Sequence, residues 1–233
     1  MSSGLPVNLS RGRFAWPLAV AAAIAGSAIA QDDDRNKALV TVCIACHNAA
    51  GIPGSEDVPS LAGQNEGYLY ESLKNFKEGN RPSPQMRGIT RDLADAELRF
   101  LAQHFALQPY VRSVQPAEPE RAARGKEVYS RLCQLCHLEG GRSTTYAEYP
   151  LLAGQSLPYM LKEIKLILDK RRRVELIKHD MLELASRPQI EDAIHFFASQ
   201  RVAPDQVSNT VTSPGKPTKR SHFRTDKPAD TAE

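Results

Sequence analysis

The four cysteines of this chain occur as two pairs, and each pair is followed directly by a histidine. The two segments, Cys43–His47 and Cys133–His137, both read Cys-x-x-Cys-His. On a helix, cysteines three residues apart lie about one turn apart on one face, so both sulfurs can reach the two vinyl groups of one porphyrin. The histidine that follows stays on that face and can reach the iron. This spacing is the attachment pattern of c-type haem. The sequence therefore predicts two covalently bound haem c groups, held by Cys43, Cys46 and His47 and by Cys133, Cys136 and His137.

Other uses of paired cysteines fit this pattern less well. Zinc would need four ligands in one cluster, and each segment offers two cysteines and one histidine. A redox-active disulfide within each pair would be expected in a βαβ context, and the chain has no alternating strand pattern of useful length. Chance is a poor explanation for two Cys-x-x-Cys-His segments at equivalent positions of a repeated sequence. We therefore favour haem over zinc and over a disulfide.

Each haem iron has a second axial position, for which methionine is the favoured candidate. Met86 follows His47 by 39 residues, and Met181 follows His137 by 44. Both fall in stretches that we expect to be irregular loops, able to wrap to the distal face of a haem. Methionine–histidine ligation raises the reduction potential of a haem. We predict Met86 and Met181 as distal ligands, with His179 as an alternative to Met181.

The two cysteine segments belong to an internal repeat. Cys43–His47 recurs 90 residues later, and Pro59–Gln64 recurs as Pro150–Gln155, 91 residues later. Tyr68 and Tyr159 keep that offset of 91. The chain is therefore predicted to contain two copies of one small domain. Units of this size often need more than apolar side chains to hold together, and a covalently held haem would complete each core.

Apolar residues in each copy recur at helical spacing, which predicts an all-α fold with three main helices per copy. The expected helices cover 35–45, 65–77 and a stretch from about residue 92 in the first copy, and 119–135, 157–168 and a stretch after Ser186 in the second. Ser186 is a plausible N-cap, and Pro188 suits the first turn that follows it.

The two ends of the chain differ in composition from its middle. Residues 1–30 combine Arg11 and Arg13, an apolar stretch and Ala28-Ile29-Ala30, which predicts a cleaved signal peptide and export to the periplasm. The apolar run of 17 residues falls short of the roughly 20 needed to span a bilayer, so no membrane span is expected after cleavage. Prolines and polar residues predict a linker over 109–118 and a disordered tail over 202–233. The predicted domains are 31–108 and 119–201.

The charge of the chain is close to balanced. The formal net charge is +3, and residues 1–30 hold two arginines and no acidic residue, so their removal leaves +1. Nucleic-acid binding usually requires a strongly basic domain. The sequence thus gives no support for a nucleic-acid partner, whereas the basic run Lys170–Arg173 suits either an acidic redox partner or a solvated loop.

The repeated Cys-x-x-Cys-His segment, the repeated Pro-x-Leu-Ala-Gly-Gln type segment and a later methionine make the sequence resemble the cytochrome c4 family, soluble dihaem carriers built from two class I cytochrome c domains. The resemblance covers roughly residues 36–200. It implies that the carbonyls of Pro59 and Pro150 orient the proximal histidines. It also makes four residues candidates for contacts with the haem propionates: Arg81, Arg172, Tyr68 and Tyr159.

Three functions compete at this point. The leading one is a periplasmic electron carrier that performs no bond chemistry and links a quinol-oxidising complex or dehydrogenase to a terminal oxidase or reductase. Its partners would be redox proteins, including membrane complexes with which it would associate peripherally. The alternative is an electron-transfer subunit bound to one dehydrogenase, such as one that oxidises sulfur compounds or alcohols. A dihaem enzyme such as a peroxidase needs an open axial site, and two well-placed methionines argue against one.

Overall fold

The computed structural model of this chain describes residues 34–49, 51, 55–110, 115–143, 146, 148–200 and 202. The expected signal peptide, residues 111–114 of the expected linker and the tail beyond residue 202 lie outside the described residues. The described part of the chain is helical and contains no strand. Its helices cover residues 34–47, α2 (Glu66–Glu78), α3 (Pro84–Thr90), α4 (Asp95–Ala106), α5 (Pro119–Val128), the π-helical turn η1 (Tyr129–Cys133), α6 (Leu138–Gly141), α7 (Leu157–Leu168), α8 (Leu176–Glu183) and α9 (Arg187–Ser199).

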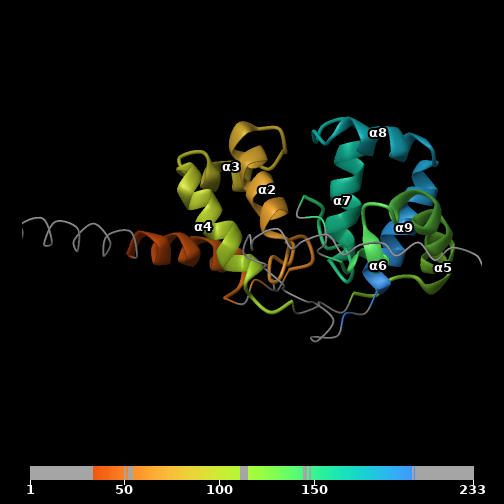
Figure 1. The fold of residues 1–233 in the computed structure, drawn as a ribbon, viewed down its shortest axis with the longest axis horizontal. Coiled ribbons are helices and arrows are strands. Elements are labelled where there is room, and N and C mark those ends of the chain that lie inside the picture. The colour runs from red at the N-terminus through yellow and green to blue at the C-terminus, as the bar shows by residue number, and fades with distance from the viewer. Residues whose placement is uncertain are drawn as a thin grey trace, which may run out of the picture.

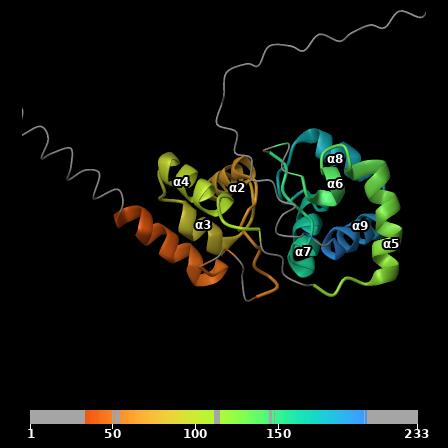
Figure 2. The same cartoon turned by 60° about the horizontal axis from the view of Figure 1, so that its bottom comes forward.

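The helices form two groups that lie side by side (Figures 1 and 2). In the first group, α2 packs on α4 and α3, and in the second, α5 packs along α9. Each group has its own apolar core. Buried side chains of α2 and α4 make up one cluster in the first group, with Leu69, Ala102, Phe105 and Ala106. The second group is centred on Tyr129, Met160, Ile194, Phe196, Phe197 and Ala198.

Several predicted helices lie close to the expected bounds, and one does not. The helix over 157–168 and the start of a helix after Ser186 match α7 and α9. The helix expected over 119–135 instead ends at Val128 and continues as the π-helical turn η1, followed by turns. Its first-copy counterpart is helical through His47, whereas His137 has φ −108° and ψ 70°, outside helical values. The backbone N–H of His137 still donates to the Cys133 carbonyl at 2.9 Å, which preserves the spacing of a helical turn.

The stretches that carry Met86 and Met181 were expected to be irregular, and that prediction was wrong. Met86 lies in α3 and Met181 in α8, so each copy has a short extra helix. In α3 the physical reason is visible in the sequence: Ser83 is the N-cap, its hydroxyl accepts from the Met86 N–H at 3.3 Å, and Pro84 occupies the first turn. Each methionine is therefore carried by a helix of defined geometry.

The two groups meet through a reciprocal set of hydrogen bonds. The Gln64 amide donates to the Leu151 carbonyl at 3.0 Å and accepts from the Leu151 N–H at 2.6 Å. The Gln155 amide makes the same two bonds to Ser60, at 2.9 and 3.0 Å. Gln64 and Gln155 are repeat equivalents, as are Ser60 and Leu151, so the contact has approximate two-fold symmetry. The repeated glutamine thus joins the copies.

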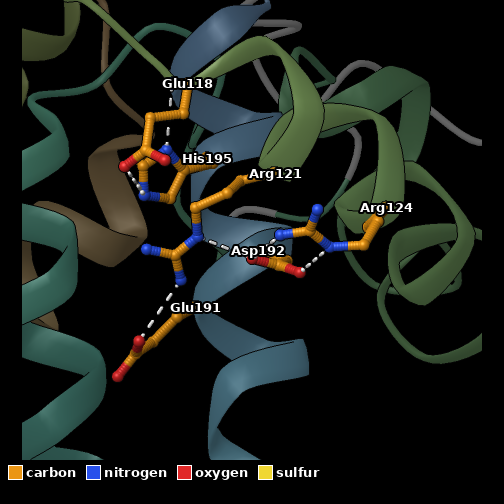
Figure 3. Close-up of polar contacts among 6 residues, drawn as sticks. All are labelled: Glu118, Arg121, Arg124, Glu191, Asp192 and His195. Atoms are coloured by element: carbon orange, nitrogen blue, oxygen red, sulfur yellow. Dashed lines mark hydrogen bonds and ion pairs between the residues drawn. The ribbon is translucent and has the colours of Figure 1, made fainter.

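Within the second group, α5 is joined to α9 by an ion-pair cluster, shown in Figure 3. Asp192 of α9 is buried, and its carboxylate lies 2.7 Å from Arg121 Nε and 2.8 Å from Arg124 Nε. Burial alone would raise the pKa of Asp192, but hydrogen bonds from Arg124 and Arg121 outweigh burial and lower it. Because a depressed pKa means that the folded state favours the carboxylate, Asp192 contributes stability above its unfolded pKa of about 3.9 and loses it below.

Asp192→Asn is expected to lower the free energy of unfolding at pH 7 by about 1–3 kcal/mol, because two guanidinium partners lose their charged acceptor. The difference from the wild type should narrow as pH falls below about 3.9, because Asp192 then binds a proton in the unfolded state and keeps its charge in the folded state only down to a lower pH. Thermal unfolding of both proteins at pH 7 and at pH 3 measures this. An equal deficit at both pH values would contradict the assigned role of the carboxylate.

Candidate haem sites

Each helix group contains a cavity that brings the predicted haem residues together. The first cavity has a volume of about 460 Å³ and is lined by Cys43, Cys46 and His47 from the cysteine segment, and by Met86 of α3. Pro59 also lines it. Residues 39 positions apart in sequence thus line one space, with the cysteines and the histidine on one segment and the methionine on another.

The second cavity has a volume of about 150 Å³ and contains the equivalent set except for one cysteine. Cys133, His137, Pro150 and Met181 line it. Cys136 does not line this cavity. Its walls are otherwise mostly apolar, with residues such as Ile164, Ile167, Ile194 and Phe197. His179, the alternative ligand, lies on α8 but is not among the lining residues, which favours Met181 over His179.

His47, the predicted proximal ligand of the first haem, is oriented by a backbone carbonyl. His47 is buried, and its Nδ1 lies 3.0 Å from the Pro59 carbonyl oxygen. Burial lowers the pKa of His47, and the Pro59 carbonyl partly opposes this shift. With Nδ1–H donating to that carbonyl, the neutral imidazole presents Nε2 as a free metal ligand.

His137, the predicted proximal ligand of the second haem, has a similar environment with one difference. Burial and the nearby cation of Lys178 lower the pKa of His137 to about 4, and the Pro150 carbonyl acts in the opposite direction. The imidazole is therefore neutral at neutral pH, the form that coordinates iron. Its Nδ1 is buried and lacks a hydrogen-bond partner of ordinary geometry among the described residues. The Pro150 carbonyl, which raises the pKa of this ring, is the repeat equivalent of the Pro59 carbonyl beside His47.

The four cysteines of the described chain form no disulfide. Burial raises the pKa of Cys43 and of Cys133 to about 11. Among the residues that the structure describes, no group of three or more His, Cys, Asp and Glu side chains gathers to hold a metal ion, as a zinc site would require. The donor set, two cysteines and one histidine beside an apolar cavity with a methionine, fits haem c.

The four candidate propionate contacts converge between the two cavities. Arg81 follows α2, yet its guanidinium lies 2.5 Å from the Tyr159 hydroxyl of α7 in the other copy. Arg172 follows α7, and its guanidinium lies 3.4 Å from the Tyr68 hydroxyl of α2. Each arginine therefore contacts the tyrosine of the opposite copy. Tyr68 and Tyr159 line both cavities, while Arg81 lines the first and Arg172 the second.

Glu163 of α7 is the member of this cluster that the sequence analysis missed. Its carboxylate lies 3.0 Å from Arg81 Nη2 and 2.6 Å from Arg172 Nη1, and it lines both cavities. Burial disfavours the charge on Arg81, but Tyr159, Tyr68 and Glu163 outweigh burial and raise its pKa. The two guanidiniums in turn outweigh burial at Tyr68 and lower its pKa. A carboxylate flanked by the buried Arg81 and the half-buried Arg172 is thus shared by the two sites.

The basic run Lys170–Arg173 also lies partly at this junction. Arg172 is held by Glu163, and the backbone N–H of Arg173 donates to the Asn80 carbonyl of the first copy at 2.9 Å. Lys170 and Arg171 remain exposed. The run therefore contributes to the contact between the copies as well as to the surface.

Comparison with known proteins gives a consistent picture. The family model for cytochrome c matches residues 122–211. Cytochrome c4 of Pseudomonas aeruginosa is 33% identical over 143 residues, which cover 58% of this chain and 70% of that protein. The thiosulfate dehydrogenase electron acceptor of Thiomonas intermedia is 28% identical over 179 residues, 72% of this chain and 82% of that protein. Among solved structures, reduced recombinant cytochrome c4 from Pseudomonas stutzeri superposes with a TM-score of 0.63 at 26% identity, covering 72% of this chain and 98% of that chain.

Proposed function

This chain belongs to the cytochrome c4 family, and we propose that it carries electrons in the periplasm from a quinol-oxidising complex or dehydrogenase to a terminal oxidase or reductase. It is an electron-transfer cytochrome with two tandem class I cytochrome c domains and two covalently bound haem c groups. None of the described helices is long and apolar enough to cross a membrane. We place the domain boundaries at 31–108 and 119–201, and the expected signal peptide over 1–30 supports export.

The observation that carries the proposal is the pairing of one histidine with one methionine in each cavity. His47 and Met86 line the first cavity, and His137 and Met181 line the second. When bound, each haem supplies a one-electron Fe(II)/Fe(III) couple. With both axial positions filled by the protein, neither iron would offer a site for a substrate, which supports carriage of electrons over catalysis.

The chain's own residues would hold the haems, orient them and exclude water. We assign the thioether bonds to the four cysteines, the orientation of the proximal rings to the Pro59 and Pro150 carbonyls, and the propionate contacts to the cluster that contains Arg81 and Arg172. Tyr68 and Tyr159 line both cavities. This shared wall supports transfer of an electron between the two haems within one molecule.

A second candidate function is favoured by two relatives. Proteins of Thiomonas intermedia and Stutzerimonas stutzeri, 28% and 27% identical to this chain, are named thiosulfate dehydrogenase electron acceptors. The electron donor of this chain could therefore be a dehydrogenase that oxidises a sulfur compound. In that case the chain would still perform electron transfer, with a dedicated donor.

Spectroelectrochemical titration of the exported, purified protein tests the proposal. We expect two one-electron transitions, a haem content of two that survives denaturation because the thioethers are covalent, and the weak near-infrared band of methionine–Fe(III) ligation at both haems. Stopped-flow mixing of the reduced protein with a terminal oxidase should give rapid oxidation. Fast reduction by a thiosulfate-oxidising dehydrogenase alone would favour the second candidate. Absence of the near-infrared band at both haems, together with turnover of hydrogen peroxide, would overturn the carrier proposal.

A further inference from the structure

The carboxylate of Glu163 lies where the two haem cavities meet, and its position suggests a role beyond joining the copies. We propose that Glu163 is a shared electrostatic tuning residue that lowers the reduction potentials of both haems by compensating the charge of Arg81 and Arg172. The inference rests on the proposed function, since it concerns the potentials of the two carriers. A single side chain would then influence the reduction potentials of both haems, in addition to the axial ligands that act on each haem separately.

The contacts of Glu163 make it the centre of the cluster. Its Oε2 lies 3.0 Å from Arg81 Nη2, 3.2 Å from Arg81 Nε and 2.6 Å from Arg172 Nη1. Arg81 comes from the first copy, whereas Glu163 and Arg172 come from the second. One oxygen of one carboxylate thus binds a guanidinium from each side of the junction. Glu163 lines both haem cavities, whereas Arg81 lines the first and Arg172 the second.

The cluster is shielded from water, so its charges act with little screening. The side-chain exposure is 4% for Arg81, 12% for Arg172 and 12% for Glu163. Interactions between charges in such surroundings are several times stronger than at the protein surface. An exposed carboxylate at the same distance from a haem would change the reduction potential of that haem less, because water screens its charge.

Glu163 also breaks the symmetry of the repeat. Tyr68 and Tyr159 are equivalent, and the same offset of 91 places Ser72 opposite Glu163. Ser72 is buried and lines the first cavity, as Glu163 lines both. The two copies therefore supply two arginines and two tyrosines but a single carboxylate. Glu163 alone therefore balances part of the positive charge of Arg81 and Arg172 between the two haem sites.

The sign of the effect follows from the charge of the two redox states. Reduction of Fe(III) adds one negative charge at the haem, so a nearby carboxylate disfavours reduction and a nearby guanidinium favours it. The cluster of two guanidiniums and one carboxylate carries a net charge of +1. Replacing the carboxylate with a neutral amide leaves the charge of both guanidiniums uncompensated, which raises both potentials.

A purely structural role predicts a different pattern. If Glu163 only joined the copies, its loss would loosen the junction and admit water to both haems. Water stabilises the more highly charged Fe(III) state, so greater exposure lowers the potential. Removing either member of an ion pair would then shift the potentials downward. Electrostatic tuning instead predicts opposite shifts for the loss of the acid and the loss of a base.

The experiment compares Glu163→Gln, Arg172→Gln and the control Glu71→Gln by spectroelectrochemistry of the purified two-haem proteins. Glu71 is an exposed acid of α2, so its substitution makes the same formal charge change in water. At a fixed potential near the wild-type midpoints, Glu163→Gln should raise the ratio of reduced to oxidised haem roughly threefold to tenfold. Arg172→Gln should lower the ratio, and Glu71→Gln should leave it within about 1.5-fold.

Limited proteolysis gives an independent readout of the junction, with cleavage in the 109–118 segment as the signal. Upward shifts in Glu163→Gln with unchanged cleavage support the inference. Downward shifts in both Glu163→Gln and Arg172→Gln with faster cleavage would overturn it in favour of a structural role, and unchanged potentials in Glu163→Gln would overturn it outright. Either of those results leaves the proposed function intact if the wild type still shows two one-electron transitions, whereas a wild type without them would remove the proposed function itself.

Discussion

Met181→Ala is expected to lower the reduction potential of one haem by about 0.1 V or more while the other haem titrates as in the wild type. Met181 lines the second cavity together with His137, and loss of a thioether ligand removes the interaction that raises the potential of a methionine–histidine haem. The near-infrared band of the oxidised protein should fall to about half of its wild-type intensity, because one of two methionine-ligated irons contributes to it. Spectroelectrochemistry and near-infrared absorption measure both changes.

His179→Ala is the matched control, since it removes the neighbouring alternative ligand from the same helix, α8. We expect both potentials and the full near-infrared band to persist, because His179 does not line the second cavity. Met86→Ala should lower the reduction potential of the first haem in the same way and also halve the near-infrared band. If His179→Ala changed the second haem and Met181→Ala did not, the assignment of the distal ligand would have to pass to His179.

Gly125→Ala should destabilise the second helix group by about 3 kcal/mol, near the upper end of the usual cost of overpacking. Gly125 lies on α5 where it crosses α9, and a Cβ at this position would lie 1.9 Å from the Asp192 carbonyl oxygen and 2.8 Å from the Ala193 nitrogen. Both atoms belong to the backbone and cannot rotate away, so the helices must separate. Urea or thermal unfolding of the purified holoprotein measures the loss.

Gly88→Ala is the control for Gly125→Ala. Gly88 also lies within a helix, α3, but nothing approaches a Cβ built on it within 4 Å. An alanine there should leave stability unchanged or raise it by about 0.5–1 kcal/mol through helix propensity. Equal destabilisation by both substitutions would mean that the close contact between α5 and α9 does not limit the stability of the protein.

The sequence allowed the fold class and the cofactors to be predicted because both depend on local patterns. The spacing within Cys43–His47 and Cys133–His137 identifies haem attachment without knowledge of the fold, and the offset of 91 residues reveals the duplication. The all-α fold and the two haem c groups were confirmed by the comparisons. The domain boundaries remain predictions, and so do the individual site residues, of which the variants of Met86 and Met181 test two.

Two features could not be predicted from the sequence, the helix around Met86 and the position of Glu163, and each has a physical reason. The helix around Met86 was missed although Ser83 and Pro84 form a start signal, because seven residues are too few to show an amphipathic period. Glu163 was missed because a single acid between lysines on a helix has the pattern of a solvated face. Its partner Arg81 lies 82 residues away in sequence and becomes a neighbour only when the two copies pack together.

The reciprocal bonds of Gln64 and Gln155 have a consequence for how the two carriers stay together. Contacts of this symmetric kind are the ones through which identical subunits pair, and pairing between separate molecules weakens as a protein is diluted. A connecting segment turns the same contact into an intramolecular one with a high effective concentration. The two haem sites therefore remain adjacent at any protein concentration, and each copy can change without losing its partner, as the difference between Ser72 and Glu163 illustrates.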